Sequence, residues 1–181
     1  MVYVFLADGF EEIEATAPID IMRRAGLEVV TVGIGGQIVR GAHNITFIAD
    51  MDGADVTPDE TVDAVVLPGG LPGTVNLENS PVVQSFLDYA VENNKLIAAI
   101  CAAPSVLGHK GILNGKTAVC FPGYEKELIG AAVKNTSVEI DQNIITSCGA
   151  GAALEFGFAL VKHLCDRETA EKLERTMQCG R

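Results

Sequence analysis

The five cysteines of this 181-residue sequence, at positions 101, 120, 148, 165 and 179, include no C-x-x-C pair. Structural zinc sites use closely spaced cysteines, and disulfide frameworks use an even number of them. The sequence therefore predicts reduced thiols, no metal site and a cytoplasmic location.

Positive charge is scarce as well. Lys and Arg number 13 against 24 Asp and Glu, which gives a formal net charge of −11 at pH 7. Nucleic acids and anionic membranes are bound through basic surfaces, so neither is an expected partner. No apolar run approaches the roughly 20 residues of a membrane-spanning helix. The first expected strand begins at Val2, so no signal peptide is expected.

Linkers, repeats and low-complexity tracts are also absent, and 48% of the residues are hydrophobic. Residues 1–181 are therefore expected to form a single domain. Strands are expected at 2–7, 27–33, 63–67, 96–100 and 117–121, with short extended pieces at 37–40 and 45–49 and a hairpin at 138–147. Helices are expected at 11–24, 81–93, 104–111, 124–132, 152–164 and 167–177. This alternation predicts a doubly wound, mostly parallel α/β sheet with helices on both faces.

Cys101 occupies the most distinctive position in the chain. Five uncharged apolar residues precede it, which is typical of a strand buried on both faces. Small residues at 99, 102 and 103 allow the sharp strand-to-helix turn of a nucleophile elbow. Because a helix N-terminus favours thiolate over thiol, we expect a lowered pKa and a reactive Cys101. The alternative is a small buried hydrophobic residue, the common role of a free cysteine.

Glu14 is the second candidate. It shares one face of the expected helix with Phe10, Ala17, Pro18 and Ile21, so it is the glutamate of that first turn most expected to point inward. Burial would raise its pKa and keep it protonated, and beside a thiolate the two groups would titrate as a pair. Alternatively, Glu14 is a solvent-exposed charge at the start of a helix.

The turn at 68–73 contains three glycines after a strand, and Gly69 and Gly70 could present backbone N–H groups to an anionic oxygen. No Gly-Lys-Ser/Thr follows this turn, and no G-x-G-x-x-G motif accompanies it, so no nucleotide site is expected.

A histidine that would complete a Cys-His triad is missing beside Cys101, where Ala102 follows. His109 is expected to face away from the pocket and His163 to lie on the surface, whereas His43 lies in a loop that could reach the pocket. An enzyme of this sequence would depend on a cysteine and a carboxylate.

Five segments resemble the ThiJ/PfpI superfamily, and within it the branch of the Parkinsonism-associated protein deglycase. They are ADGFEEIE at 7–14, MRRAG at 22–26, VLPGG at 66–70, AAICAAP at 98–104 and TSCG at 146–149. They occur in the family's order over almost the whole chain. The resemblance implies a flavodoxin-like fold, similar to class I glutamine amidotransferases, and a homodimer.

The resemblance also implies Cys101 as nucleophile, Glu14 as its protonated partner, and oxyanion-hole amides at Gly70 and Ala102. Four further pocket positions would be His43, Phe121, Cys148 and Arg24. His43 and Cys148 stand where the human-type branch has arginines, and Phe121 stands where it has a histidine. The family's proteases have a histidine directly after the cysteine, so Ala102 argues against a protease.

The leading hypothesis is a glyoxalase- or deglycase-type enzyme without a cofactor. It would act on reactive dicarbonyls such as methylglyoxal, or on their adducts, and so protect against carbonyl and oxidative stress. The alternative is a redox sensor or chaperone switched by oxidation of Cys101, and a third reading is a family member that only binds.

Overall fold

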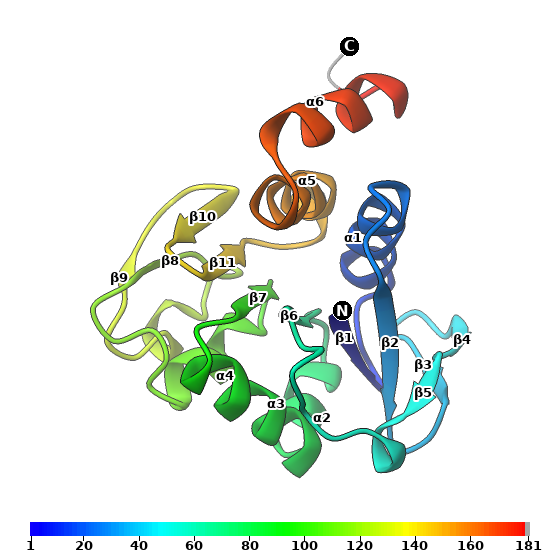
Figure 1. Cartoon of the computed structure of the whole chain (residues 1–181). Coiled ribbons are helices and arrows are strands. Elements are labelled where there is room, and N and C mark those ends of the chain that lie inside the picture. Colours follow the sequence, from blue (N-terminus) through cyan, green and yellow to red (C-terminus); the bar gives the residue numbers. More distant parts are fainter. Residues whose placement is uncertain (180–181) are drawn as a thin grey trace.

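A seven-stranded sheet forms the centre of the molecule in the computed structural model, which describes residues 1–179 (Figure 1). The strand order is β10-β11-β7-β6-β1-β2-β5. The strands are β1 (Val2–Ala7), β2 (Val29–Ile34), β5 (Met51–Asp52), β6 (Ala64–Leu67), β7 (Leu96–Ile100), β10 (Val138–Asp141) and β11 (Ile144–Ser147). Neighbouring strands pair in parallel except in the β10–β11 hairpin. The predicted, mostly parallel sheet is confirmed.

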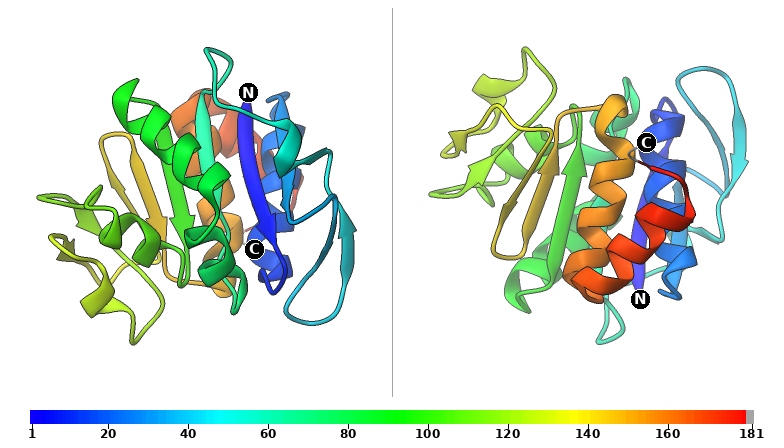
Figure 2. Two further views of the ribbon diagram at one scale, coloured as in Figure 1. Left: turned by 90° about the horizontal axis from the view of Figure 1, so that it is seen from below. Right: turned by 90° about the horizontal axis from the view of Figure 1, so that it is seen from above.

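Helices cover both faces of this sheet (Figure 2). One face carries α1 (Glu12–Arg24), α5 (Ala153–Leu164) and α6 (Arg167–Thr176), and the other carries α2 (Gly73–Glu78), α3 (Pro81–Glu92) and α4 (Pro104–His109). Successive strand residues point to opposite faces, so Val4 packs in the core with Ile21, whereas Phe5 packs in the core with Phe86. Burial on both faces explains why these strands are apolar throughout.

Several elements differ from those expected. Residues 124–132 form no α-helix but a 3₁₀ turn, η2 (Glu125–Glu127), and then β9 (Ala132–Val133), which pairs with β8 (Thr117–Ala118). Gly123 and Gly130, with φ of 102° and 80°, end any helical path there, because a helix needs φ near −63°. The short elements α2 and β5 were not expected, and the strand at 117–121 is shorter than predicted.

The expected extended pieces form a small hairpin of β3 (Ile38–Arg40) and β4 (Thr46–Ile48) beside the main sheet. Across residues 1–179, no helix combines the length and the apolar character needed to cross a membrane.

Four neighbouring strands, β11, β7, β6 and β1, run in the same direction. Their carboxyl ends therefore meet at one edge of the sheet, where open α/β folds bind their ligands. Ser147, Ile100, Leu67 and Ala7 are the last residues of these strands. The loops that follow them contain the residues that the sequence singled out.

Candidate active site

Cys101 directly follows β7 and is held on both sides by its backbone. Its N–H donates to the carbonyl of Ser147 at 2.8 Å, and its carbonyl accepts from the N–H of Phe121 at 2.8 Å. Its φ is 66°, a left-handed conformation that non-glycine residues seldom adopt. Such strain costs about 1–3 kcal/mol and persists where the surrounding structure imposes it. The predicted sharp turn at Cys101 is confirmed.

Glu14 lies in the first turn of α1 and is 1% exposed, so the prediction that it points inward is confirmed. Its Oε2 accepts a hydrogen bond from the N–H of Gly69 at 2.9 Å. Burial raises the pKa of Glu14 to about 7, although Cys101 and the backbone N–H groups of Gly69 and Ala150 favour its ionised form. At neutral pH, this carboxyl group can therefore both give and take a proton.

The thiol of Cys101 and the carboxyl group of Glu14, here the acid–thiol pair, interact across the site. Burial and the charge of Glu14 raise the pKa of Cys101 to about 12, while the N–H groups of Ala102 and Gly70 lower it. The expectation of a lowered pKa is wrong: α4 begins only at Pro104 and has six residues, so its dipole does not offset a buried carboxylate. Because each group is a cause of the other's shift, the two titrate as a coupled pair.

Gly69 makes room for this contact. A Cβ at Gly69 would lie 2.6 Å from Cβ of Cys101 and 2.6 Å from Oε2 of Glu14, so no side chain fits there. Gly70 has a φ of +88°, and a Cβ there would lie 2.4 Å from the backbone nitrogen of Glu11. The two glycines therefore allow the turn after β6 to approach both members of the pair.

Phe121 and the sulfur of Cys101 both lie close to Gly149. A Cβ at Gly149 would lie 3.2 Å from Cδ2 of Phe121 and 4.0 Å from Sγ of Cys101. The Phe121 side chain is 47% exposed, which gives this side of the site an apolar and accessible wall. The structure thus places Phe121 beside the site, as the sequence predicted.

The remaining candidates lie elsewhere. Arg24 pairs with Asp20 at 2.6 Å in the exposed last turn of α1, about 15 Å along the helix from Glu14. Within one chain, the prediction that Arg24 lines the pocket is therefore wrong. His109 lies between Glu78 and Glu127, at 2.5 and 2.8 Å, and faces away as expected.

His163 is exposed on α5, which confirms its predicted surface position. Cys148 follows β11, and its half-buried thiol lines a separate cavity together with Cys120. The structure thus places these two thiols beside a cavity that they share, outside the acid–thiol pair.

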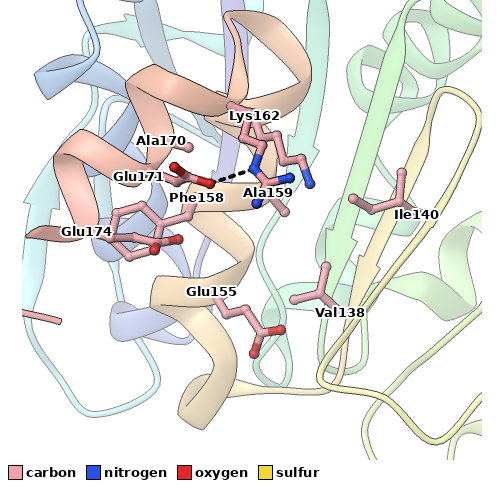
Figure 3. Close-up of a pocket in the computed structure, with 10 residues that line it drawn as sticks. Val138, Ile140, Glu155, Phe158, Ala159, Lys162, Ala170, Glu171 and Glu174 are labelled. Atoms are coloured by element: carbon pink, nitrogen blue, oxygen red, sulfur yellow. Dashed lines mark hydrogen bonds and ion pairs between the residues drawn. The ribbon is translucent and has the colours of Figure 1, made fainter. Parts of the chain in front are cut away.

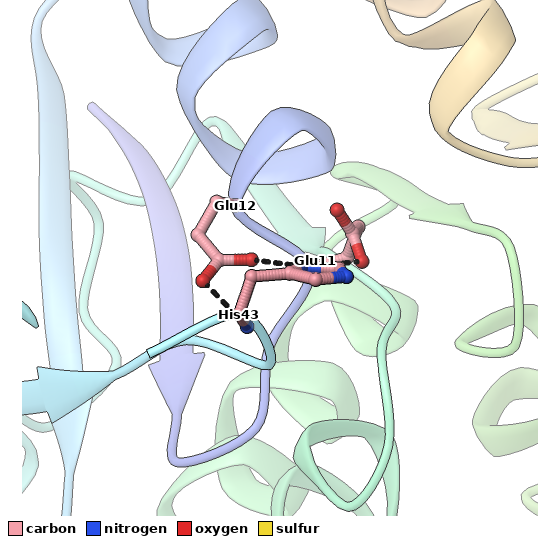
Figure 4. A group of neighbouring side chains, drawn as sticks. All are labelled: Glu11, Glu12 and His43. Carbon is pink, nitrogen blue, oxygen red and sulfur yellow. Dashed lines mark hydrogen bonds and ion pairs between the residues drawn. The ribbon is translucent and has the colours of Figure 1, made fainter. Parts of the chain in front are cut away.

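His43 joins Glu11 and Glu12 in a group whose ligand atoms lie within 4.8 Å of one another (Figure 4). Nδ1 of His43 lies 3.0 Å from Oε2 of Glu12 and 3.5 Å from Oε2 of Glu11. Oε1 of Glu12 accepts from the N–H groups of His43 and Ile45. Three such residues could ligate a cation, but the contacts of Glu12 already fasten the loop between β3 and β4 onto the start of α1.

These contacts shift the pKa values of Glu12 and His43. Burial raises the pKa of Glu12, but its hydrogen bonds from His43 and Ile45 outweigh burial and lower it overall. The hydrogen bond that the protonated ring of His43 donates to Glu12, and the charges of Glu11 and Glu12, raise the pKa of His43. A protonated His43 therefore stabilises the loop between β3 and β4. The charge of Glu11 also contributes to the raised pKa of Glu14.

A second pocket lies between β10, α5 and α6 (Figure 3). Val138, Ile140 and Phe158 supply its apolar wall, and an ion pair of Arg167 with Glu171 crosses its rim. It shares no lining residue with the predicted site.

Two contributors to the site were missed in the sequence. The carbonyl of Ser147 fixes the backbone of Cys101, and the N–H of Ala150 faces Glu14. The only signal for either was the small-residue run TSCG at the end of β11.

Comparison with known proteins identifies a family and several relatives of this chain. The model described as the DJ-1/PfpI family matches residues 1–163. A glutathione-independent glyoxalase of Caenorhabditis elegans is 34% identical over 167 residues, which cover 92% of this chain and 86% of the relative. A deglycase of Pyrococcus abyssi is 32% identical over 149 residues, which cover 81% and 88% of the two chains.

The fold agrees as well. The solved structure of oxidized DJ-1 from Toxoplasma gondii matches with a TM-score of 0.95 at 35% identity, covering 99% of this chain and 98% of the other. The resemblance carried by the five sequence segments is thereby confirmed. On the family match over residues 1–163, this chain belongs to the DJ-1/PfpI family.

Proposed function

We propose that this protein is a cofactor-independent enzyme that converts reactive dicarbonyls such as methylglyoxal, or their adducts with proteins or nucleotides, with Cys101 as nucleophile. The observation that carries the proposal is the buried acid–thiol pair, whose sulfur is approached by the N–H groups of Gly70 and Ala102. The names of two relatives, a glyoxalase and a deglycase, support this class of reaction.

The reaction begins when Glu14 holds the proton and the charge of the pair lies on sulfur. The Cys101 thiolate adds to the aldehyde carbon, and the resulting oxyanion accepts hydrogen bonds from Gly70 and Ala102 before it is protonated to a hemithioacetal. Glu14 then removes the proton from C1 and returns one to C2, which converts the adduct into a hydroxy-acid thioester. Water hydrolyses the thioester, so methylglyoxal and water give lactate and free Cys101.

Lactate release from methylglyoxal tests this mechanism. Cys101→Ser should abolish turnover, and Glu14→Gln should lower it by about 10²–10⁴-fold, the range of general acid–base catalysis. Cys165→Ser removes an exposed thiol after α5 and should leave turnover unchanged. Full turnover in Cys101→Ser would show the mechanism to be wrong.

A redox-sensing or chaperone role is the second candidate. Two equivalents of peroxide would oxidise the Cys101 thiol to a sulfinate, which protonated Glu14 would hydrogen-bond. The buried contact of the pair and the oxidized state of the Toxoplasma relative's structure favour this candidate. Intact mass after mild peroxide discriminates: two oxygens confined to the Cys101 peptide support sensing, and oxidation of all five thiols counts against it.

We also propose that the protein is a cytoplasmic homodimer and that it does not act as a protease. The hairpin of β3 and β4 exposes Ile38 and Ile48 at 72% and 79%, a surface that a second copy could cover. Five free thiols suit a reducing compartment. Sedimentation of the purified protein tests the homodimer, and cell fractionation tests the cytoplasmic location.

A further inference from the structure

Two thiols outside the acid–thiol pair open into one cavity of about 540 Å³. Cys120 and Cys148 line it together with Glu125, Lys134 and Ser137. A volume of this size lies within the range of small-ligand pockets. Neither thiol has a part in the proposed reaction, so the cavity calls for a separate explanation.

The chain segment 134–137 frames this cavity. The N–H of Lys134 donates to the carbonyl of Ala118 at 2.8 Å, and the N–H of Cys148 donates to the carbonyl of Ser137 at 3.0 Å. The segment therefore spans from the end of β8 to the end of β11. Backbone hydrogen bonds hold both ends of the segment, so the backbone at Lys134 and Cys148 is fixed beside the same cavity.

The charges in the cavity suit a zwitterionic ligand. Lys134 forms no ion pair with any residue of the described part of the chain, so its ammonium group can receive a carboxylate. One oxygen of Glu125 accepts from the N–H of Gly123 at 2.9 Å, which leaves the other oxygen for an ammonium group. Amino acids and short peptides carry both kinds of group.

We propose that this cavity is a thiol-modification site, in which Cys148 exchanges with a low-molecular-weight disulfide that bears carboxylate and ammonium groups. The Cys148 thiolate, its proton lost to water, attacks one sulfur of the small disulfide. The S–S bond of the reagent breaks, a new bond joins that sulfur to Cys148, and the other half leaves as a thiolate that takes a proton from water. Cys148 is oxidised and the departing half is reduced.

Cys120 is the more deeply buried of the two thiols. It is 5% exposed, and burial together with the charge of Glu125 raises its pKa to about 11. Unlike Cys101, it has no side-chain hydrogen-bond partner within the described residues to take its proton, so we expect it to attack the new mixed disulfide slowly. The adduct on Cys148 should accumulate instead of passing on to a Cys120–Cys148 disulfide.

Rates of modification by two reagents test the proposal. The protein is incubated with oxidised glutathione, which is zwitterionic, or with hydroxyethyl disulfide, which is uncharged, and adducts are quantified by peptide mass. The ratio of the two rates at one thiol cancels that thiol's intrinsic reactivity. We expect this ratio at Cys148 to exceed the ratio at exposed Cys165 by about fivefold, the effect of one favourable ion pair.

Variants separate this site from the acid–thiol pair. Lys134→Ala should lower the ratio at Cys148 by about two- to fivefold and leave hydroxyethyl disulfide unaffected. Cys148→Ser should remove the favoured adduct, whereas Cys101→Ser should keep it even if the proposed enzyme activity is lost. Equal ratios at Cys148 and Cys165, an unchanged ratio in Lys134→Ala, or loss of the adduct in Cys101→Ser would each overturn the proposal.

Discussion

Replacing Glu14 by glutamine should change how the stability of the fold depends on pH. The carboxyl group has a pKa of about 7 in the folded protein and a reference value of 4.5 when exposed. The folded state therefore binds this proton more tightly than the unfolded chain does. The stabilisation is fully present below about pH 4.5 and is lost as the pH rises through about 7.

The size of the effect follows from the two pKa values. Each pKa unit corresponds to about 1.36 kcal/mol, so ionisation of Glu14 should cost the folded state about 3 kcal/mol by pH 8. Glutamine has nearly the same shape and cannot ionise, so a variant with Gln at position 14 does not bear this cost. With urea m-values of about 1–3 kcal/mol/M, the unfolding midpoints of the two proteins should shift relative to each other by about 1 M or more.

Urea unfolding at several pH values between about 4.5 and 8 measures this shift. The Cys101→Ser background is the suitable one, because it removes the thiol that titrates together with Glu14. The free energy of unfolding is measured for Cys101→Ser and for the double variant Cys101→Ser/Glu14→Gln. The value for Cys101→Ser minus the value for the double variant should fall steadily as the pH rises. A constant difference would refute the raised pKa, and a difference that grows with pH would mean that the fold stabilises the carboxylate.

Three further predictions concern the surroundings of the acid–thiol pair. Gly69→Ala should destabilise the protein by about 1–3 kcal/mol in urea unfolding and lower lactate release, because its methyl group would overlap both members of the pair. Gly151→Ala is the matched control, because a Cβ there meets nothing within 4 Å, and it should change neither the stability nor lactate release. His43→Ala should be less stable than the wild type below about pH 6.5, because a raised histidine pKa stabilises the fold there, and the two should converge at higher pH, where His43 loses its proton to water; equal stability at low pH would count against the ion pair with Glu12. Phe121→Ala should change KM for methylglyoxal with stability altered by less than about 0.5 kcal/mol, since its ring is half exposed, and an unchanged KM would remove Phe121 from the substrate wall.

The fold was predictable because its core strands are apolar on both faces. In Leu96–Ile100 and Ala64–Leu67, each residue is buried against one helical layer or the other, so the runs lack polar alternation. The prediction of a helix at 124–132 was wrong for a different reason. A helix was expected there, whereas Gly130 has a positive φ and packs against Asn114, a neighbour sixteen positions away in the sequence.

Position along the chain was enough to single out Cys101 and Glu14, the two groups of the proposed reaction, but not to predict their pKa values. Cys101 stood out because an apolar strand ends at it, and Glu14 stood out because one helical face is apolar. Their pKa values depend on partners from separate segments: Gly69 and Gly70 after β6, and Ala150 after β11. A local feature, the start of α4, suggested a lowered thiol pKa, whereas burial and the facing carboxylate decided its direction. Since both groups compete for one proton in a buried space, the thiolate that the proposed reaction needs exists only while Glu14 is protonated. In the proposed reaction, the carboxyl group that raises the pKa of Cys101 must therefore also hold the proton that the Cys101 thiol releases.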